Sequence, residues 1–226
     1  MRKENNNRKD EIKKPCLLLC EGMDEMQFLI WYLNDKLLRE NFAYDKIQIL
    51  DFGGIRDLAK YLLALKGTGN FDEVERIAIM RDAETDSLAA VSSLNTVLAN
   101  DPELQKIISP YPYFLLPGKD EQGNWQNGTL EDLCLEIFRE SEEHELSKRQ
   151  ARALSSSFLQ ECVKLRGHKF KRQHKNQLHF YLSATDKYVG MKVGEAARAG
   201  AYDWDNVALG ELKKFLTILA TGAADA

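Results

Sequence analysis

The sequence lacks any apolar run close to the roughly 18–20 residues that a membrane-spanning helix needs. No long apolar stretch follows the basic N-terminal residues, so a signal peptide is not expected. None of the four cysteines forms a Cys-x-x-Cys pair, and zinc-finger spacing is therefore missing. Lys and Arg (31) do not outnumber Asp and Glu (35), so the net charge is −4. These absences predict a cytoplasmic protein without membrane contact, in which any nucleic-acid binding depends on a local basic patch.

What is present is an ordinary globular balance, with 44% hydrophobic and 29% charged residues among 226. A chain of this length can bury one substantial core without metal or disulfide support. Residues 1–14 are polar and are expected to form a flexible tail. Cys16 and Cys20 flank three leucines, which predicts buried, inert thiols in a reducing compartment.

Four short apolar runs predict strands, each bounded by turn or helix signals: Cys16–Cys20, Lys46–Leu50, Val74–Met80 and Tyr111–Leu116. Helical patterns separate them. The first begins near Asp24, a candidate N-cap with Gln27 as its reciprocal partner. The others cover residues 55–65 and 87–98. This alternation predicts a parallel sheet of about four strands with helices on both faces.

The pattern changes after Gly118, where a turn-rich loop precedes a mostly helical region. Helices are expected at residues 129–139, 145–165, 171–183, 193–199 and 207–219. We therefore expect an α/β core at residues 15–118. Residues 119–226 should form an acidic-motif loop and a helical part that packs on this core.

Acidic side chains follow two of the predicted strands directly. Glu21, Asp24 and Glu25 come after the first strand, and the segment Asp82–Asp86 follows the third. Ligands of parallel sheets bind at the carboxyl ends of the strands. Oxygen ligands without nearby His or Cys suit Mg²⁺ or Mn²⁺. We expect carboxylate oxygens of Glu21 and Asp82 about 4–6 Å apart, because each Mg²⁺–O contact is about 2.1 Å.

Two simpler interpretations stay open for these acids. Loops after strands are often acidic because they are solvated. Asp24 could also cap the first helix, and Asp86 or Thr85 could cap the helix at 87–98.

The order of these motifs resembles the TOPRIM domain, the fold shared by topoisomerases, bacterial primases and nucleases of the OLD (overcoming lysogenisation defect) family. The matching residues are Glu21-Gly22, Gly53-Gly54 and Asp82-Ala83-Glu84, each after a strand. The segment Glu21–Glu25 is similar to the first motif of OLD-type nucleases. Residues 128–133 and 194–216 resemble short stand-alone TOPRIM-like proteins. The resemblance covers nearly the whole chain after residue 15 and implies a TOPRIM-like Rossmannoid sheet.

The resemblance implies roles for individual residues. Glu21 and Asp82 match catalytic metal ligands. Glu84 and Glu25 stand where the family usually has Asp, so each side chain keeps its charge but is longer by one methylene group. Asp86 could take the place of Glu84 as a metal ligand. Glu131 and Asp132 are candidate ligands of a second metal. Thr129 and Asp132 alternatively form a capping box.

The family also uses a late lysine near the cleaved phosphate. Lys175 opens an apolar helical run and is our candidate, with Lys169, Lys171 and Arg172 as competitors. The last three lie in the densest basic stretch, residues 164–175, and are predicted to bind nucleic acid. A solvated basic face is the simpler alternative.

The sequence therefore predicts a Mg²⁺- or Mn²⁺-dependent phosphodiesterase, a nuclease acting on DNA or RNA. The alternative is a TOPRIM-like module that binds metal and phosphate without catalysis and serves a partner protein or a homo-oligomer. The ATPase of larger OLD-type proteins is not found in this sequence, which keeps the alternative open. A primase-like enzyme is less well supported, because no zinc ribbon is present.

Overall fold

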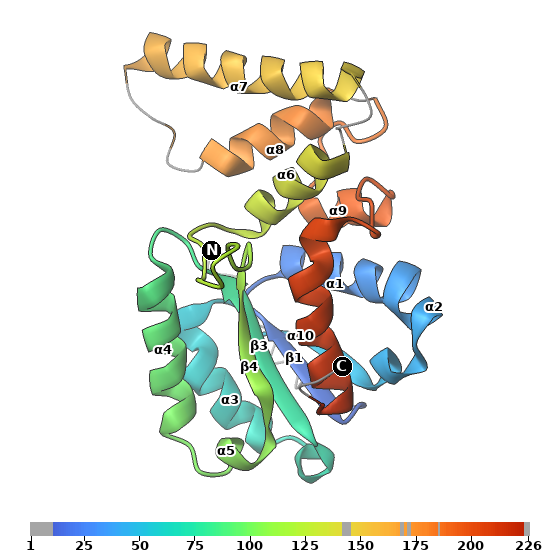
Figure 1. Ribbon diagram of the computed structural model, residues 1–226. Coiled ribbons are helices and arrows are strands. Elements are labelled where there is room, and N and C mark those ends of the chain that lie inside the picture. The colour runs from blue at the N-terminus through green and yellow to red at the C-terminus, as the bar shows by residue number, and fades with distance from the viewer. Residues whose placement is uncertain (1–10, 142–145, 168–169, 171–172, 185, 224–226) are drawn as a thin grey trace, which may run out of the picture.

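A four-stranded, fully parallel sheet with the order β2-β1-β3-β4 forms the centre of the computed structural model (Figure 1). The model describes residues 11–141, 146–167, 170, 173–184 and 186–223. The strands are β1 (Cys16–Cys20), β2 (Ile47–Asp51), β3 (Arg76–Asp82) and β4 (Ile108–Leu116). The predicted α/β class is thus confirmed. β2 and β3 begin slightly later than predicted, and β4 begins earlier.

The central strand β1 explains why the sequence shows a continuous apolar run rather than an alternating one. Every residue of β1 is buried, with Cys16, Leu18 and Cys20 in the core on one face and Leu17 and Leu19 in the core on the other. A strand that is covered on both faces needs apolar side chains at every position.

Helices cover both faces of the sheet (Figure 1). On one face lie α1 (Met23–Tyr32), α9 (Val193–Arg198) and α10 (Gly210–Thr221). On the other lie α3 (Leu58–Lys66), α4 (Ser87–Ala99) and the short α5 (Leu104–Ile107). A π-helical turn (Leu33–Leu37) continues α1 into α2 (Leu38–Glu40).

Three further helices extend beyond the carboxyl edge of the sheet (Figure 1). They are α6 (Leu130–Ser141), α7 (Leu146–Arg166) and α8 (Gln173–Ser183), and α8 packs against both of the others. Each helix predicted after Gly118 is present, although α10 begins only at Gly210, after a 3-10 turn (Val207–Leu209). No helix in the described ranges is long and apolar enough to cross a membrane.

The predicted N-cap of the first helix is wrong. Gly22 occupies the N-cap of α1, and Asp24 lies within the first turn. The extended backbone of Gly22 lets the helix begin directly after β1. Asp24 instead accepts a hydrogen bond from the backbone of Gly194 in α9 (3.5 Å), so it connects two helices.

Arg76, the first residue of β3, connects the sheet to the end of α10. Its guanidinium donates hydrogen bonds to the carbonyls of Leu219 (2.7 Å) and Ala220 (3.0 Å). Carbonyls at a helix C-terminus lack partners within the helix, and a cation there is favourable. Arg76 thus provides hydrogen-bond donors for carbonyls of the last turn of α10, although the two elements are separated by more than half of the sequence.

We expect Arg76→Met to lower the free energy of unfolding by about 1–3 kcal/mol, because two partly buried carbonyls lose a charged donor. Urea denaturation followed by circular dichroism measures this. Arg39→Met, at a side chain that is 75% exposed, is the matched control and should leave stability nearly unchanged. Equal midpoints for wild type and Arg76→Met would contradict the role.

Candidate metal and phosphate site

The carboxyl ends of β1 and β3 are adjacent, which is the arrangement needed if Glu21 and Asp82 are to contribute to one site. The strands pair with Cys20 opposite Met80, so Glu21 comes to lie beside Arg81. The Arg81 Nε is 3.4 Å from Oε2 of Glu21 and also donates to the backbone carbonyl of Asp82 (3.1 Å). One guanidinium therefore holds the two strand ends together.

Glu21 is held by backbone on its other side. The N–H of Ile55 donates to its Oε1 at 3.3 Å. The preceding Gly53 and Gly54 have φ of 80° and 122°, which side chains rarely allow, and this conformation brings the N–H of Ile55 to Glu21. The second glycine motif of the sequence thus positions the first acidic residue.

One oxygen of Glu21 makes an ion pair with Arg81 but no hydrogen bond within the described ranges. Its Oε2 is buried and accepts no hydrogen bond from the part of the chain that the structure describes. Burial raises the pKa of Glu21, whereas Arg81 opposes that rise. The cation that reaches this buried oxygen is Arg81, whose ion pair compensates it without forming a hydrogen bond.

Asp82 is the most strongly perturbed acid of this edge. Its Oδ1 accepts a hydrogen bond from the N–H of Leu130 at the start of α6 (2.9 Å). Burial raises the pKa of Asp82 to about 8, and the charges of Glu25, Glu131 and Glu21 contribute to the rise. Asp82 therefore shares one electrostatic environment with three other carboxylates.

Glu25, in the first turn of α1, belongs to the same environment. Burial raises its pKa to about 7, with contributions from Asp24, Glu131 and Glu21. Its carboxylate folds back over Gly22, where a Cβ would lie only 2.8 Å from Oε2. The glycine after Glu21 is thus needed for the close approach of Glu25.

Glu131 joins the cluster from α6 and is paired with Lys175 of α8. The Nζ of Lys175 lies 2.8 Å from Oε1 of Glu131, whose side chain is only 9% exposed. Burial by itself would raise the pKa of Glu131, but Lys175 brings it below its ordinary value. The predicted lysine and the predicted second-metal acid are therefore in direct contact.

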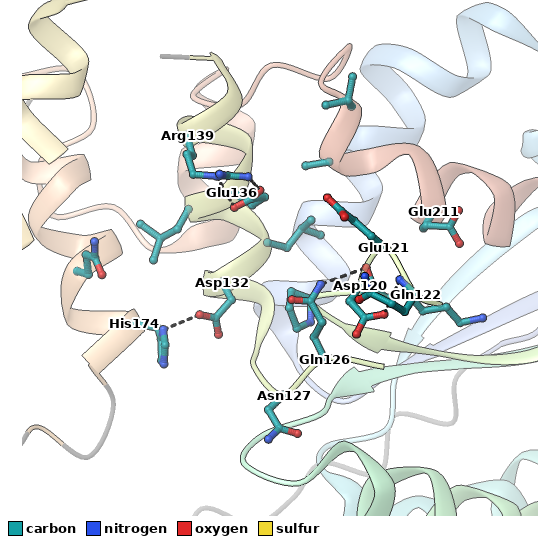
Figure 2. Close-up of a pocket in the computed structure, with 18 residues that line it drawn as sticks. Asp120, Glu121, Gln122, Gln126, Asn127, Asp132, Glu136, Arg139, His174 and Glu211 are labelled. Atoms are coloured by element: carbon teal, nitrogen blue, oxygen red, sulfur yellow. Dashed lines mark hydrogen bonds and ion pairs between the residues drawn. The ribbon is translucent and has the colours of Figure 1, made fainter. Parts of the chain in front are cut away.

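Asp132 follows the capping alternative. Its Oδ2 accepts from the N–H (2.8 Å) and the hydroxyl (3.1 Å) of Thr129, while Oδ1 contacts Nδ1 of His174 (2.5 Å). Figure 2 shows His174 of α8 directed toward this carboxylate. Asp132 therefore fixes the start of α8 against the start of α6.

The acids after Asp82 have different surroundings. Glu84 is exposed, adopts φ 56° and exchanges two backbone hydrogen bonds of 2.8 Å with Gly128. Its charge contributes to raising the pKa of Glu21, so it faces the same edge. Asp86 caps α4 by accepting from the N–H of Ala89 (2.9 Å), as one of the sequence alternatives predicted. Lys169, Lys171 and Arg172 lie outside the described residues.

Two cavities meet at the contact between α6 and α8. A cavity of about 630 Å³ is lined by Asp82, Glu131, Lys175 and other residues of these elements. A neighbouring cavity of about 770 Å³, shown in Figure 2, lies on the other side of Asp132 and His174, which line both. The first is lined by the predicted site residues Asp82, Glu84, Glu131 and Lys175, but not by Glu21 or Glu25, and is the candidate functional site.

No three His, Cys, Asp or Glu side chains in the described ranges lie close enough together to form a ready-made metal cluster. The acids are instead compensated by Arg81 and Lys175. Sequence reasoning missed Arg81 and His174. A charged residue inside the apolar strand 76–82 was a usable signal for Arg81, which is only 7% exposed. Nothing local indicated His174, because its partner is distant in sequence.

The chain is similar to known proteins at two levels. It resembles the solved C-terminal region of the Burkholderia pseudomallei OLD protein, with a TM-score of 0.48 and 13% sequence identity over 93% of this chain and 100% of that chain. No curated protein sequence matches it. The model of the family described as "Protein of unknown function (DUF3226)" matches residues 15–221, and the chain belongs to this family.

Proposed function

We propose that the protein is a divalent-metal-dependent phosphodiesterase of the TOPRIM type that acts on nucleic acid. The observation that carries this proposal is the electrostatic coupling of Glu21, Glu25, Asp82 and Glu131 at one edge of a parallel sheet. Lys175 is ion-paired with the last of them at the wall of a cavity. Coupled acids with a lysine beside them suit a charged phosphate and a cation better than a neutral ligand.

The residues present fit Mg²⁺ or Mn²⁺. The donors are carboxylates, the ligands that these ions prefer. Oε2 of Glu21 is buried and makes no hydrogen bond among the described residues, and a metal ion there would replace its ion pair with Arg81. Glu21 and Asp82 would hold one ion. Glu25 and Glu131 would hold a second, with Glu84 and Asp86 as further candidates at the exposed side of the edge.

The protein's own groups suggest a division of roles. An ion held by these carboxylates would supply Lewis-acid chemistry, polarising a phosphate and lowering the pKa of water. Asp82 is oriented through Oδ1 by the N–H of Leu130, which leaves Oδ2 for a ligand. Lys175 would exchange its contact with Glu131 for an oxygen of the phosphate and stabilise the charge that develops there. Lys169, Lys171 and Arg172 would bind neighbouring phosphates.

One observation favours the alternative, a binding module that does not catalyse. Among the described residues Arg81 pairs with Glu21 and Lys175 pairs with Glu131, and no ready-made ligand cluster is formed. In that case the wild type would cut neither DNA nor RNA in Mg²⁺ or Mn²⁺. Its affinity for nucleic acid would then fall when Lys169, Lys171 and Arg172 are neutralised.

Asp82→Asn is expected to lower the rate of nucleic-acid cleavage by at least about 100-fold, because it removes a ligand while the amide keeps the side-chain volume. The measurement is a gel assay on single- and double-stranded DNA and RNA with Mg²⁺ and then Mn²⁺. Asp72→Asn, at an exposed position outside the cavity, is the control and should cut like wild type. If purified wild type cuts none of these substrates, the enzyme proposal fails.

The metal-free protein is expected to lose stability as the pH rises from about 5 to 8. The folded state keeps protons on Asp82 (pKa about 8) and Glu25 (pKa about 7) that the unfolded chain, with values of 3.8 and 4.5, has already released. Asp82→Asn should therefore raise the melting temperature in EDTA at pH 8 and have less effect at pH 5. Mg²⁺ should raise the wild-type value at pH 8. A melting temperature that is independent of both pH and Mg²⁺ would refute the buried-carboxylate account.

Lys175→Met should slow cleavage by about 10- to 100-fold, because the developing charge on the phosphate loses a cation. The concentration of Mg²⁺ for half-maximal activity should not rise, since the substitution frees Glu131 rather than removing a ligand. Titration of activity against Mg²⁺ for wild type, Lys175→Met and the exposed control Lys106→Met gives both quantities. A parallel increase in the Mg²⁺ requirement would show that Lys175 acts through the metal.

A further inference from the structure

The cavity of about 630 Å³ has an aromatic wall in addition to its acidic one. Phe170 lines it together with Gln173, His174 and Lys175, opposite Asp82 and Glu131. Phosphate chemistry by itself does not require an aromatic side chain at this position. The ring therefore points to a second part of the ligand that is flat and apolar.

The ring of Phe170 is in contact with a cation of the neighbouring helix α7. The guanidinium carbon of Arg166, the last residue of α7, lies 5.1 Å from the centre of the ring. In this cation–π contact the guanidinium covers one face of the ring, so a base would stack on the other face. Proteins that bind single-stranded nucleic acid combine these two elements, a ring for a base and a cation for the backbone.

The size of the cavity and the burial of the acids limit which nucleic acid can reach them. A volume of about 630 Å³ lies in the range of about 300–1,000 Å³ that holds one small ligand, so it suits a nucleotide. The side chain of Glu131, which lines the cavity, is only 9% exposed. Enzymes that act on a base take it out of the duplex, and a base that reaches Phe170 inside this cavity would likewise have to be unpaired and unstacked.

From these observations we infer that the ligand is single-stranded nucleic acid, with one base stacked on Phe170 and the adjoining phosphate directed to Lys175. The inference rests on the proposed function for the role of the phosphate, and it adds the substrate class. Stacking is tolerant of sequence, since every base has a flat face. The site should therefore select unpaired strands without a strong preference for one base.

Fluorescence anisotropy with labelled oligonucleotides tests this inference without depending on cleavage. The probes are a single strand of about 12 nucleotides, within the 4–16 that one single-strand site covers, and the duplex of the same sequence. Ca²⁺ is present in place of Mg²⁺, and a denaturing gel verifies that the probes stay intact. Wild type should bind the single strand at least about 10-fold more tightly than the duplex, a preference that one stacked base can account for.

Phe170→Leu should weaken binding of the single strand by about 5- to 150-fold, the equivalent of about 1–3 kcal/mol for one stacked base. It should leave duplex binding within about twofold, and Phe170→Tyr should restore single-strand binding, because tyrosine also stacks. Phe158→Leu is the matched control. Phe158 is 52% exposed and stacks on Phe180 in the same helical pair, but it does not line the cavity.

The outcomes separate this inference from the proposed function. Preferred binding of the duplex, or unchanged single-strand binding in Phe170→Leu, would overturn the inference even if the protein cuts DNA. Single-strand binding that depends on Phe170, without cleavage in Mg²⁺ or Mn²⁺, would support the inference and remove the enzyme proposal.

Discussion

The candidate site depends on one electrostatic constraint, the burial of several carboxylates at one edge of a parallel sheet. Like charges in a poorly solvated place repel, and their desolvation is costly. The fold compensates them from several directions. Arg81 lies against Glu21, Lys175 pairs with Glu131, and backbone N–H groups donate to Glu21 and Asp82. The raised pKa values of Glu25 and Asp82 show that this compensation is incomplete.

The same constraint accounts for details that have no role in packing. Gly22 leaves room for the carboxylate of Glu25, and Gly53 and Gly54 adopt backbone conformations that bring an N–H to Glu21. The first two residues of α6 both contribute to the site. The N–H of Leu130 donates to Asp82, and the side chain of Glu131 pairs with Lys175. Backbone geometry at each strand end is thus matched to an acidic side chain.

The helices beyond the sheet complete the site. α8 reaches the acids only because it packs against α6, and the contact between His174 and Asp132 fixes the two helix starts relative to each other. Lys175 is the next residue of α8, so this contact also determines where its ammonium group lies.

Much of the fold could be predicted from local sequence. Apolar runs of five to seven residues between turn signals correspond to the four strands, because strands buried on both faces favour apolar residues. The placement of Glu21 and Asp82 at neighbouring strand ends also follows, since parallel strands end at the same edge. Helix boundaries were less predictable. Asp24 has the chemistry of a cap, but the extended Gly22 begins the helix before it.

The sequence by itself determined the strands, the helices and the types of side chain available at the carboxyl edge, because these depend on periodicity and on near neighbours. Only the tertiary structure decided which acids share one environment and which cation compensates each. Glu131 and Lys175 are far apart in the chain and meet because α6 and α8 pack together. The roles of Arg81 and Phe170 also depend on tertiary contacts. Their neighbours come from other elements, and the strength of a charge or a stacking surface depends on what surrounds it in space.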